Sequence, residues 1–221
     1  MNYRRITLLA GHYGSGKTNI AVNMAMDLKK IHENTAIADL DIVNPYYRTL
    51  DSRKELDEAG IRLIVSPYAN TNLDIPALPQ EMYAIVHDKR MHAVVDVGGD
   101  DRGALALGRL SPYIREEGDY DMLLVCNCYR PLTRDAASVK EVVQEIEEAG
   151  KLKFTGFVNN SNLGADTTPQ VVLDSLGFAR DVARETGLKL MFTSVEASLY
   201  DALKDDIENL FPMKLQKRPV D

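Results

Sequence analysis

A glycine-rich segment directly after an apolar run limits what this chain can fold into more than any other feature. Residues 6–10 are apolar except for one threonine, as in a buried strand, and residues 11–18 read Gly-His-Tyr-Gly-Ser-Gly-Lys-Thr, the pattern G-x-x-x-x-G-K-[ST] of a phosphate-binding loop. Residues 19–31 then carry apolar side chains at helical spacing, at Ile20, Met24, Leu28 and Ile31. A strand, a loop and a helix are therefore predicted in that order, with a nucleoside triphosphate bound at the loop.

Each residue type in this loop has a chemical role. Glycines allow consecutive backbone N–H groups to curl around phosphate oxygens, and a helix that begins near the end of the loop adds the positive end of its dipole. We expect Lys17 to contact the β- and γ-phosphates and the Thr18 hydroxyl to bind Mg²⁺. The phosphates would lie against the backbone of the other loop residues, which are Gly11, Gly14, Ser15 and Gly16.

Composition limits the class of protein. The 221 residues are enough for one domain with a normal core, so we expect a single nucleotide-binding domain over residues 1–221. A formal net charge of −7 argues against sequence-independent binding to nucleic acid or to an anionic membrane, because both depend on clustered lysine and arginine. No apolar run approaches the length of a membrane span. Two cysteines and no secretory signal favour a reducing, cytoplasmic location.

Short apolar segments alternate with helical patterns along the chain. This alternation predicts an α/β fold, a three-layer α/β/α sandwich around a mostly parallel sheet. The expected strands cover residues 4–10, 35–39, 61–66, 93–97, 122–127, 154–159 and 189–193. The expected helices cover residues 18–31, 53–59, 79–87, 104–116, 134–149, 168–186 and 199–210, the last with an acidic outer face and packed on the sheet. Residues 66–79 are expected to form a long surface loop.

Acidic residues follow two of the predicted strands. The second strand ends in Asp39-Leu40-Asp41, and the fourth ends in Asp96, followed three residues later by Gly99. In an open parallel sheet, ligands bind beyond the carboxyl ends of the strands. A carboxylate at such a strand tip can hold Mg²⁺, which fits Asp96, and a glycine N–H three residues on could sense a γ-phosphate.

These motifs together resemble the MinD/ParA branch of the P-loop ATPases, a branch that also holds CobQ/CobB-type proteins. The resemblance rests on the loop at 11–18, the acidic pair with a following Pro45, the Asp96-x-x-Gly99 spacing and the segment 156–161. It covers about residues 4–195. It implies a P-loop NTPase fold, ATP and Mg²⁺ as ligands, a water-orienting role for Asp41 and a role near the metal for Asp39.

The resemblance also implies how the base is read. The asparagine that ends the sixth strand reads the adenine edge in this branch, which corresponds to Asn160, or to its neighbour Asn159. The Asn-Lys-x-Asp guanine signature of many GTPases is not found in the sequence, which favours adenine.

One departure from the branch concerns a catalytic charge. Most members carry a signature lysine that crosses an ATP-bridged homodimer to the partner's phosphates, whereas this chain has His12 at that position. Arg48 or Arg130 could supply the missing positive charge, and each could equally be a surface arginine. A homodimer, if ATP forms one, should be weaker than in typical members of the branch.

Three classes of function remain open from the sequence. The first is a slow ATPase that acts as a switch on a protein partner. The second is a small-molecule kinase or ATP-dependent ligase of the CobQ or dethiobiotin-synthetase type, with the acceptor at residues 66–79. The third is a metallochaperone ATPase that uses Cys126 and Cys128, because residues i and i+2 of a strand face the same side; the alternative for these cysteines is simple burial.

Overall fold

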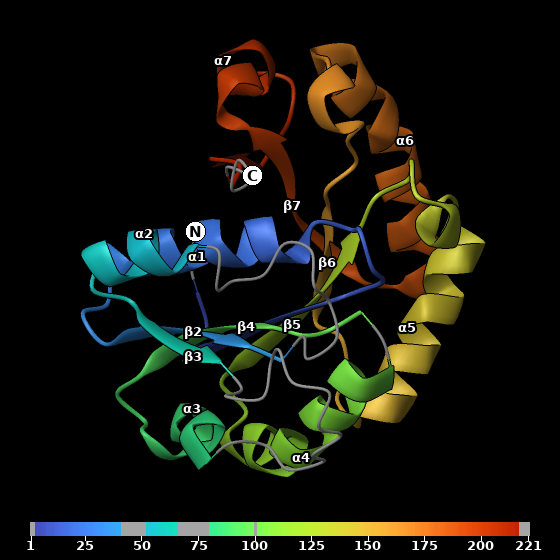
Figure 1. The fold of residues 1–221 in the computed structure, drawn as a ribbon. Helices are drawn as coiled ribbons and strands as arrows, with labels where there is room; N and C mark the ends of the chain where they lie inside the picture. Colours follow the sequence, from blue (N-terminus) through green and yellow to red (C-terminus); the bar gives the residue numbers. More distant parts are fainter. Residues whose placement is uncertain (1–2, 41–51, 66–79, 100, 217–221) are drawn as a thin grey trace, which may run out of the picture.

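The computed structural model describes residues 3–40, 52–65, 80–99 and 101–216, except for the side chains of residues 101 and 102. Within these ranges eight strands form one sheet in the order β3-β2-β4-β1-β5-β6-β7-β8, and all neighbouring strands run parallel (Figure 1). The strands are β1 (Ile6–Ala10), β2 (Thr35–Asp39), β3 (Arg62–Val65), β4 (His92–Asp96), β5 (Tyr120–Cys126), β6 (Gly156–Asn159), β7 (Lys189–Glu196) and β8 (Leu210–Met213).

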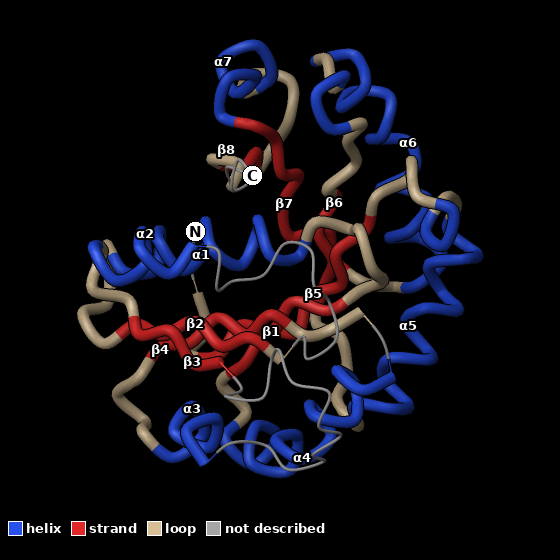
Figure 2. Tube along the Cα trace, in the orientation of Figure 1, coloured by secondary structure: helices blue, strands red, loops and turns tan. Residues whose placement is uncertain are grey.

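Helices cover the sheet on two sides. Helices α1 and α2 lie on one face and α3 and α4 on the other, which gives the three layers (Figure 2). Helices α5 and α6 pack with the second group in one apolar cluster. The helices are α1 (Lys17–Lys29), α2 (Arg53–Glu58), α3 (Ala84–His87), α4 (Asp101–Glu117), α5 (Ala136–Gly150), α6 (Pro169–Thr186) and α7 (Tyr200–Leu203), with short 3₁₀ turns η2 (Gln80–Tyr83), η3 (Pro131–Thr133), η4 (Gly164–Asp166) and η5 (Ala197–Leu199).

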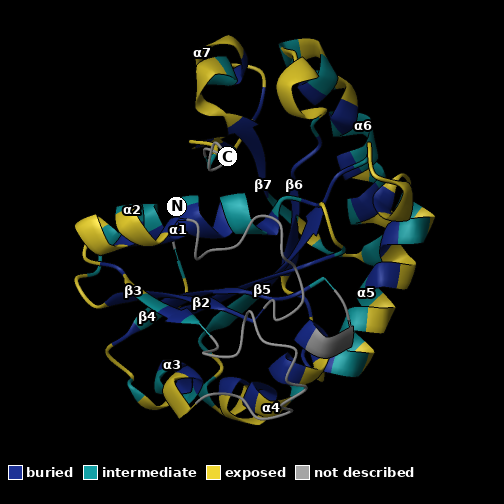
Figure 3. Cartoon of the chain, viewed as in Figure 1, coloured by how far each residue is buried: buried dark blue, intermediate teal, exposed yellow. Residues whose placement is uncertain are grey.

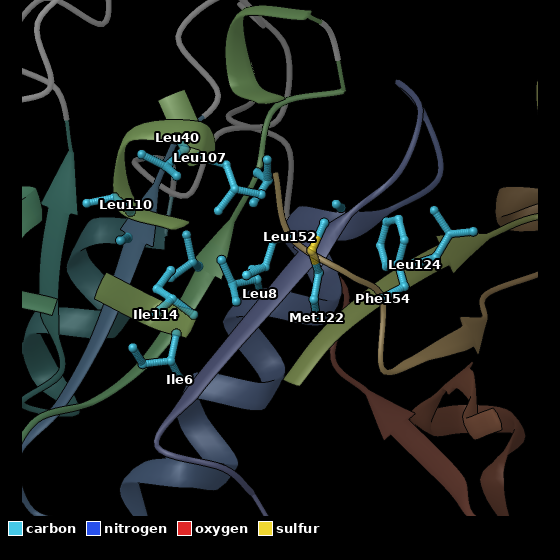
Figure 4. Packing of buried hydrophobic residues seen from close by; sticks show 14 of the residues in the cluster. Ile6, Leu8, Leu40, Leu107, Leu110, Ile114, Met122, Leu124, Leu152 and Phe154 are labelled. Atoms are coloured by element: carbon cyan, nitrogen blue, oxygen red, sulfur yellow. The ribbon is translucent and has the colours of Figure 1, made fainter. Parts of the chain in front are cut away.

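The central strands are buried on both faces (Figure 3). Along β1, Ile6 and Leu8 pack towards α4, with Leu107 and Ile114, as Figure 4 shows. Leu9, the next residue along the strand, packs on the opposite face with residues of α1. This two-sided burial explains why the strands read as nearly continuous apolar runs, as expected of a parallel sheet covered by helices.

The predicted α/β sandwich is confirmed, and the sheet is parallel throughout the described residues. All seven predicted strands are present, with small differences at their ends. The predicted loop at residues 66–79 lies outside the described residues.

The predicted helix over residues 199–210 is wrong. Helix α7 ends at Leu203, and after a turn the chain forms an eighth strand from Leu210. Asn209 adopts a left-handed backbone conformation with φ of 55°, which interrupts any helix at that point. Pro212 is accommodated because β8 is an edge strand. The apolar spacing at Leu203 and Ile207 reflects their packing against α6 and β7 in a small separate cluster.

Among the described helices, none is both long enough and apolar enough to cross a membrane.

Candidate nucleotide site

The phosphate-binding loop joins β1 to α1 and has the backbone shape that its glycines predict. Gly14 and Gly16 have φ of 77° and 90°, in the left-handed region that glycine adopts without strain. Gly16 is also the N-cap of α1. A Cβ at Gly16 would come within 2.2 Å of the Asn160 side-chain nitrogen, so a larger residue would displace one of the two segments.

Lys17 is the first residue of α1, and it is buried. Its ammonium folds back across the loop and donates a hydrogen bond to the carbonyl oxygen of His12 at 3.1 Å. The ammonium therefore lies beside the loop backbone, at the place where the phosphates of a nucleotide are expected.

Thr18 and Asp96 meet across the site. The Thr18 hydroxyl donates to Oδ2 of Asp96 at 2.6 Å, which joins the start of α1 to the end of β4. Asp39 ends the neighbouring strand β2 in register with Asp96, and both carboxylates are buried. A hydroxyl and carboxylates are hard oxygen ligands of the kind that Mg²⁺ prefers, so the donor set fits this ion.

Gly99 lies against the phosphate-binding loop. A Cβ at this position would come within 2.6 Å of the Tyr13 amide nitrogen and 3.0 Å of the Gly11 carbonyl oxygen. The segment after β4 and the loop after β1 thus pack backbone to backbone, and only glycine fits between them.

Asn159 and Asn160 have different environments. The Asn159 amide is fully buried and bonds within the fold, to the Ser175 hydroxyl at 2.8 Å and the Ser161 hydroxyl at 2.7 Å. The Asn160 side chain donates to the Ser15 carbonyl oxygen at 2.6 Å and accepts from the Ser194 hydroxyl at 2.8 Å. It therefore links the phosphate-binding loop to the end of β7, and it lines the cavity described next.

A cavity of about 460 Å³ opens beside the loop. This volume is within the range of small-molecule sites. Its walls come from the carboxyl ends of β1, β5, β6, β7 and β8. They include loop residues Tyr13, Gly14, Gly16, Lys17 and Thr18, then Arg130, Asn160, Ser161 and Asn162, then Ser194, Val195 and Glu196, and finally Met213, Leu215 and Gln216.

Arg130 stands over the phosphate-binding loop. Its side-chain Nε lies 4.0 Å from the position that a Cβ on Gly14 would occupy. The turn that carries it is fixed by Asn127, whose carbonyl oxygen accepts from the Arg130 amide at 3.0 Å and from the Thr133 hydroxyl at 2.7 Å. By contrast, the imidazole of His12 points towards α5, with its Nε2 3.9 Å from a carboxylate oxygen of Glu145.

The two cysteines do not both belong to β5. Strand β5 ends at Cys126, so the strand alternation that would align the two thiols does not continue to Cys128. Cys126 is fully buried in the apolar core, and this burial raises the pKa of its thiol. Cys128 is half-buried in the following turn. In the described part of the chain, no group of three or more His, Cys, Asp or Glu residues is arranged to hold a metal ion.

Two predicted site residues, Asp41 and Arg48, lie outside the described residues. The sequence reasoning did not identify the walls formed by residues 194–196 and 213–216. No motif marks them. The second wall, residues 213–216, lies at the end of β8, part of which the sequence pattern predicts as a helix. If these residues are assigned to a strand instead, the carboxyl end of that strand is expected at this edge of the sheet.

The sheet, the loop and the buried lysine define the P-loop nucleoside triphosphatase fold, and comparison with solved structures agrees. The chain is similar to the 54 kDa protein of the signal recognition particle from Aeropyrum pernix in complex with GDP, with a TM-score of 0.54 and 15% identity over 87% of this chain and 41% of that one. It is also similar to FtsY from Mycoplasma mycoides (TM-score 0.56, 14% identity, 88% and 61% covered) and to cell division protein FtsY from Thermotoga maritima (TM-score 0.58, 16% identity, 86% and 61% covered).

This chain spans less than two thirds of each of those chains, and the low identity means that the likeness shows the fold alone. The sequence matches no protein-family model, and the search of curated proteins found no match.

Proposed function

We propose that this chain is a Mg²⁺-dependent ATPase of the MinD/ParA-like kind, which works in the cytoplasm as a nucleotide-driven switch on a protein partner and turns over slowly alone. The observation that carries the proposal is the meeting of Lys17, Thr18 and Asp96 beside a cavity of about 460 Å³. These groups come from two different strand ends, and together they offer a cation and hard oxygen ligands to a metal-bound polyphosphate.

Each residue then has a defined task. Lys17 neutralises the β- and γ-phosphates, while Thr18 and Asp96 hold Mg²⁺, which offsets the charge that develops on the phosphates. Asp39, which pairs in register with Asp96, orients a metal-bound water, and Gly99 offers its N–H to the γ-phosphate. Asp41 orients the attacking water.

The base is proposed to be adenine, read by Asn160. An amide side chain has two N–H donors and two acceptor lone pairs on its oxygen, and the bonds to Ser15 and Ser194 use one of each. One donor and one lone pair remain for the edge of a base. Asn159 is a poorer reader, because its fully buried amide bonds to Ser175 and Ser161.

The structure favours Arg130 as the source of the additional positive charge. Its guanidinium lies above Gly14 within the same chain, whereas His12 at the signature position faces Glu145. An arginine placed in cis can stabilise the charge of phosphoryl transfer without a second subunit.

A protein partner is proposed because exposed apolar side chains lie at the edge of the sheet that carries the site. Tyr13 is 60% exposed, Leu132 is 56% exposed and Leu163 is 46% exposed, and each lies in a connection that follows the carboxyl end of a strand. Exposed apolar groups at a ligand-binding edge are typical of interaction surfaces.

The experiment that tests nucleotide binding is calorimetry with Mg-ATP and with Mg-GTP on the wild type and on Lys17→Ala. We expect the wild type to bind ATP more tightly, and the variant to lose at least about a hundredfold in affinity, because charged hydrogen bonds to phosphate are removed. Lys30→Ala is the control, since Lys30 is an exposed lysine at the other end of α1. A preference for GTP would contradict the adenine assignment, and equal affinity of the two variants would refute the site.

The experiment that tests Arg130 is single-turnover hydrolysis. We expect Arg130→Ala to bind ATP with an affinity within a few fold of the wild type but to hydrolyse it at least tenfold more slowly. Arg134→Ala is the matched control, because Arg134 belongs to the same turn and is paired with Asp135 at the surface. Equal rates in the two variants would remove Arg130 from the mechanism.

A further inference from the structure

Strand β8 lies on the side of α1 away from β1 and β2 (Figure 2), and the chain segment after β8 bonds to that helix. We call residues 214–216 the C-terminal strap. The side chain of Asn23 bonds to both backbone groups of Lys214, accepting from its amide at 2.8 Å and donating to its carbonyl oxygen at 2.9 Å. One turn earlier on the helix, the Asn19 side chain accepts from the Gln216 amide at 3.0 Å. Two asparagines of α1 therefore fix the path of the strap.

The strap also reaches the beginning of α2. The Gln216 side chain donates to the hydroxyl of Ser52, the N-cap of α2, at 2.6 Å. The Lys214 ammonium lies 2.8 Å from a carboxylate oxygen of Glu55 in the first turn of that helix. The strap thus connects two helices that cover the same face of the sheet.

The third property of the strap is its contact with the cavity. Leu215 and Gln216, together with Met213 at the end of β8, form one of the cavity walls. The phosphate-binding loop forms another wall, with its cationic Lys17. Apolar side chains such as Leu215 and Met213 suit a base or a ribose and do not suit phosphate oxygens, so this wall belongs to the nucleoside end of the cavity.

We propose that the C-terminal strap is a nucleoside-positioning wall. Its Leu215 side chain packs against the bound nucleotide, and the bonds of the strap to α2 couple nucleotide binding to the position of that helix. This inference rests on the proposed function. It follows that residues that do not contact the nucleotide influence the affinity with which it binds. Asn23 does not line the cavity, yet it determines where the Leu215 side chain lies.

The test compares Asn23→Ala with Asn34→Ala, an asparagine whose amide donates to Asp88 at the surface. We expect Asn23→Ala to weaken binding of Mg-ATP about fivefold in calorimetry, as the loss of hydrogen bonds loosens the wall. Asn34→Ala should bind as the wild type does. Leu215→Ser, a change at a residue that is 42% exposed, should weaken binding to a similar degree without affecting folding.

A second measurement follows the strap directly. Trypsin cuts after Lys214, and mass spectrometry identifies the product. We expect saturating Mg-ATP to slow this cut severalfold in the wild type and to have a smaller effect in Asn23→Ala. If the wild type binds no nucleotide, the proposed function fails first. If the wild type binds and both Asn23→Ala and Leu215→Ser keep its affinity, the strap is only a structural tether and the inference is refuted.

Discussion

The side chain of Asn160 provides the sharpest test of how the site is held together. It is 3% exposed, its Nδ2 donates to the Ser15 carbonyl oxygen at 2.6 Å, and its Oδ1 accepts from the Ser194 hydroxyl at 2.8 Å. The amide cannot be reversed, because the Ser15 carbonyl oxygen can only accept, so its partner on Asn160 must be the N–H donor. Asn160→Asp and Asn160→Ala therefore perturb the same contact in different ways.

The alanine variant loses both side-chain bonds, and the one to Ser15 has no replacement. The Ser15 carbonyl oxygen is left without this donor, whereas the Ser194 hydroxyl keeps the carbonyl oxygen of Asn159 at 3.4 Å as an alternative acceptor. A buried group without its partner costs about 1–3 kcal/mol, so we expect the free energy of unfolding to fall by about 2 kcal/mol. For a chain of this length, that corresponds to a fall of about 4–8 °C in Tm.

The aspartate variant should be worse at neutral pH and should recover in acid. An ionised carboxylate would face the Ser15 carbonyl oxygen as acceptor against acceptor, so the folded state prefers the protonated form, which can donate. The pKa of the new carboxyl is then raised in the folded state, and its stabilising contribution is complete below the unfolded pKa and is lost as the pH rises through the folded pKa.

The assay is urea denaturation of the wild type and both variants at pH 5 and pH 8. We expect Asn160→Asp to be less stable than Asn160→Ala at pH 8, and the gap between them to narrow at pH 5. An aspartate variant as stable as the wild type at pH 8, with no dependence on pH, would show that the amide does not donate to Ser15.

Three further outcomes are expected. Gly99→Ala should weaken nucleotide binding at least tenfold, because its side chain would displace the phosphate-binding loop, whereas Gly177→Ala, inside α6 and clear of close contacts, should raise Tm; calorimetry and thermal melts check both. A thiol reagent should label Cys128 and not Cys126 in the native protein, and equal labelling would contradict the burial of Cys126. Burial opposes the ionisation of Glu117, but its arginine and lysine partners hold its pKa below the usual range. The stabilising contribution of Glu117 should therefore be present above about pH 4.5 and be lost as the pH falls through the lowered pKa. In acid denaturation, Glu117→Gln should not show this loss.

The sequence predicts those parts of the fold and site that depend on local residue type. The phosphate-binding loop can be predicted because Gly16 must adopt a positive φ and Lys17 must follow it, independently of the rest of the chain. The strands can be predicted because a parallel sheet covered on both faces needs apolar runs, and the predicted bounds of β2 are the observed ones.

Contacts between distant segments could not be predicted in the same way. Asn160 bonds to Ser15, 145 positions away in the chain, and nothing in either segment alone specifies that pair. The helix predicted after Leu203 is wrong because the buried residues there, which include Ile207, have helical spacing in the sequence although they belong to a small separate cluster. The conformation of Asn209, which breaks that spacing, is not visible in the sequence pattern.

The hydrogen bonds around the cavity indicate where a nucleotide-dependent change can begin. The turn after β5 is held by the buried amide of Asn127, which bonds to Tyr129 in that turn and to Asn162 after β6. The segment after β6 is held by the buried amide of Asn159, which bonds to Ser161 in that segment and to Ser175 in α6. Because these loops are already ordered, they contribute little to a switch and little to the entropic cost of binding. The strap differs from both, since its side chains are partly exposed and its bonds run to α1 and α2. A ligand that packs on Leu215 would therefore shift α2 before it shifts the loops, and α2 is the element in which nucleotide-dependent protection from hydrogen exchange should be largest.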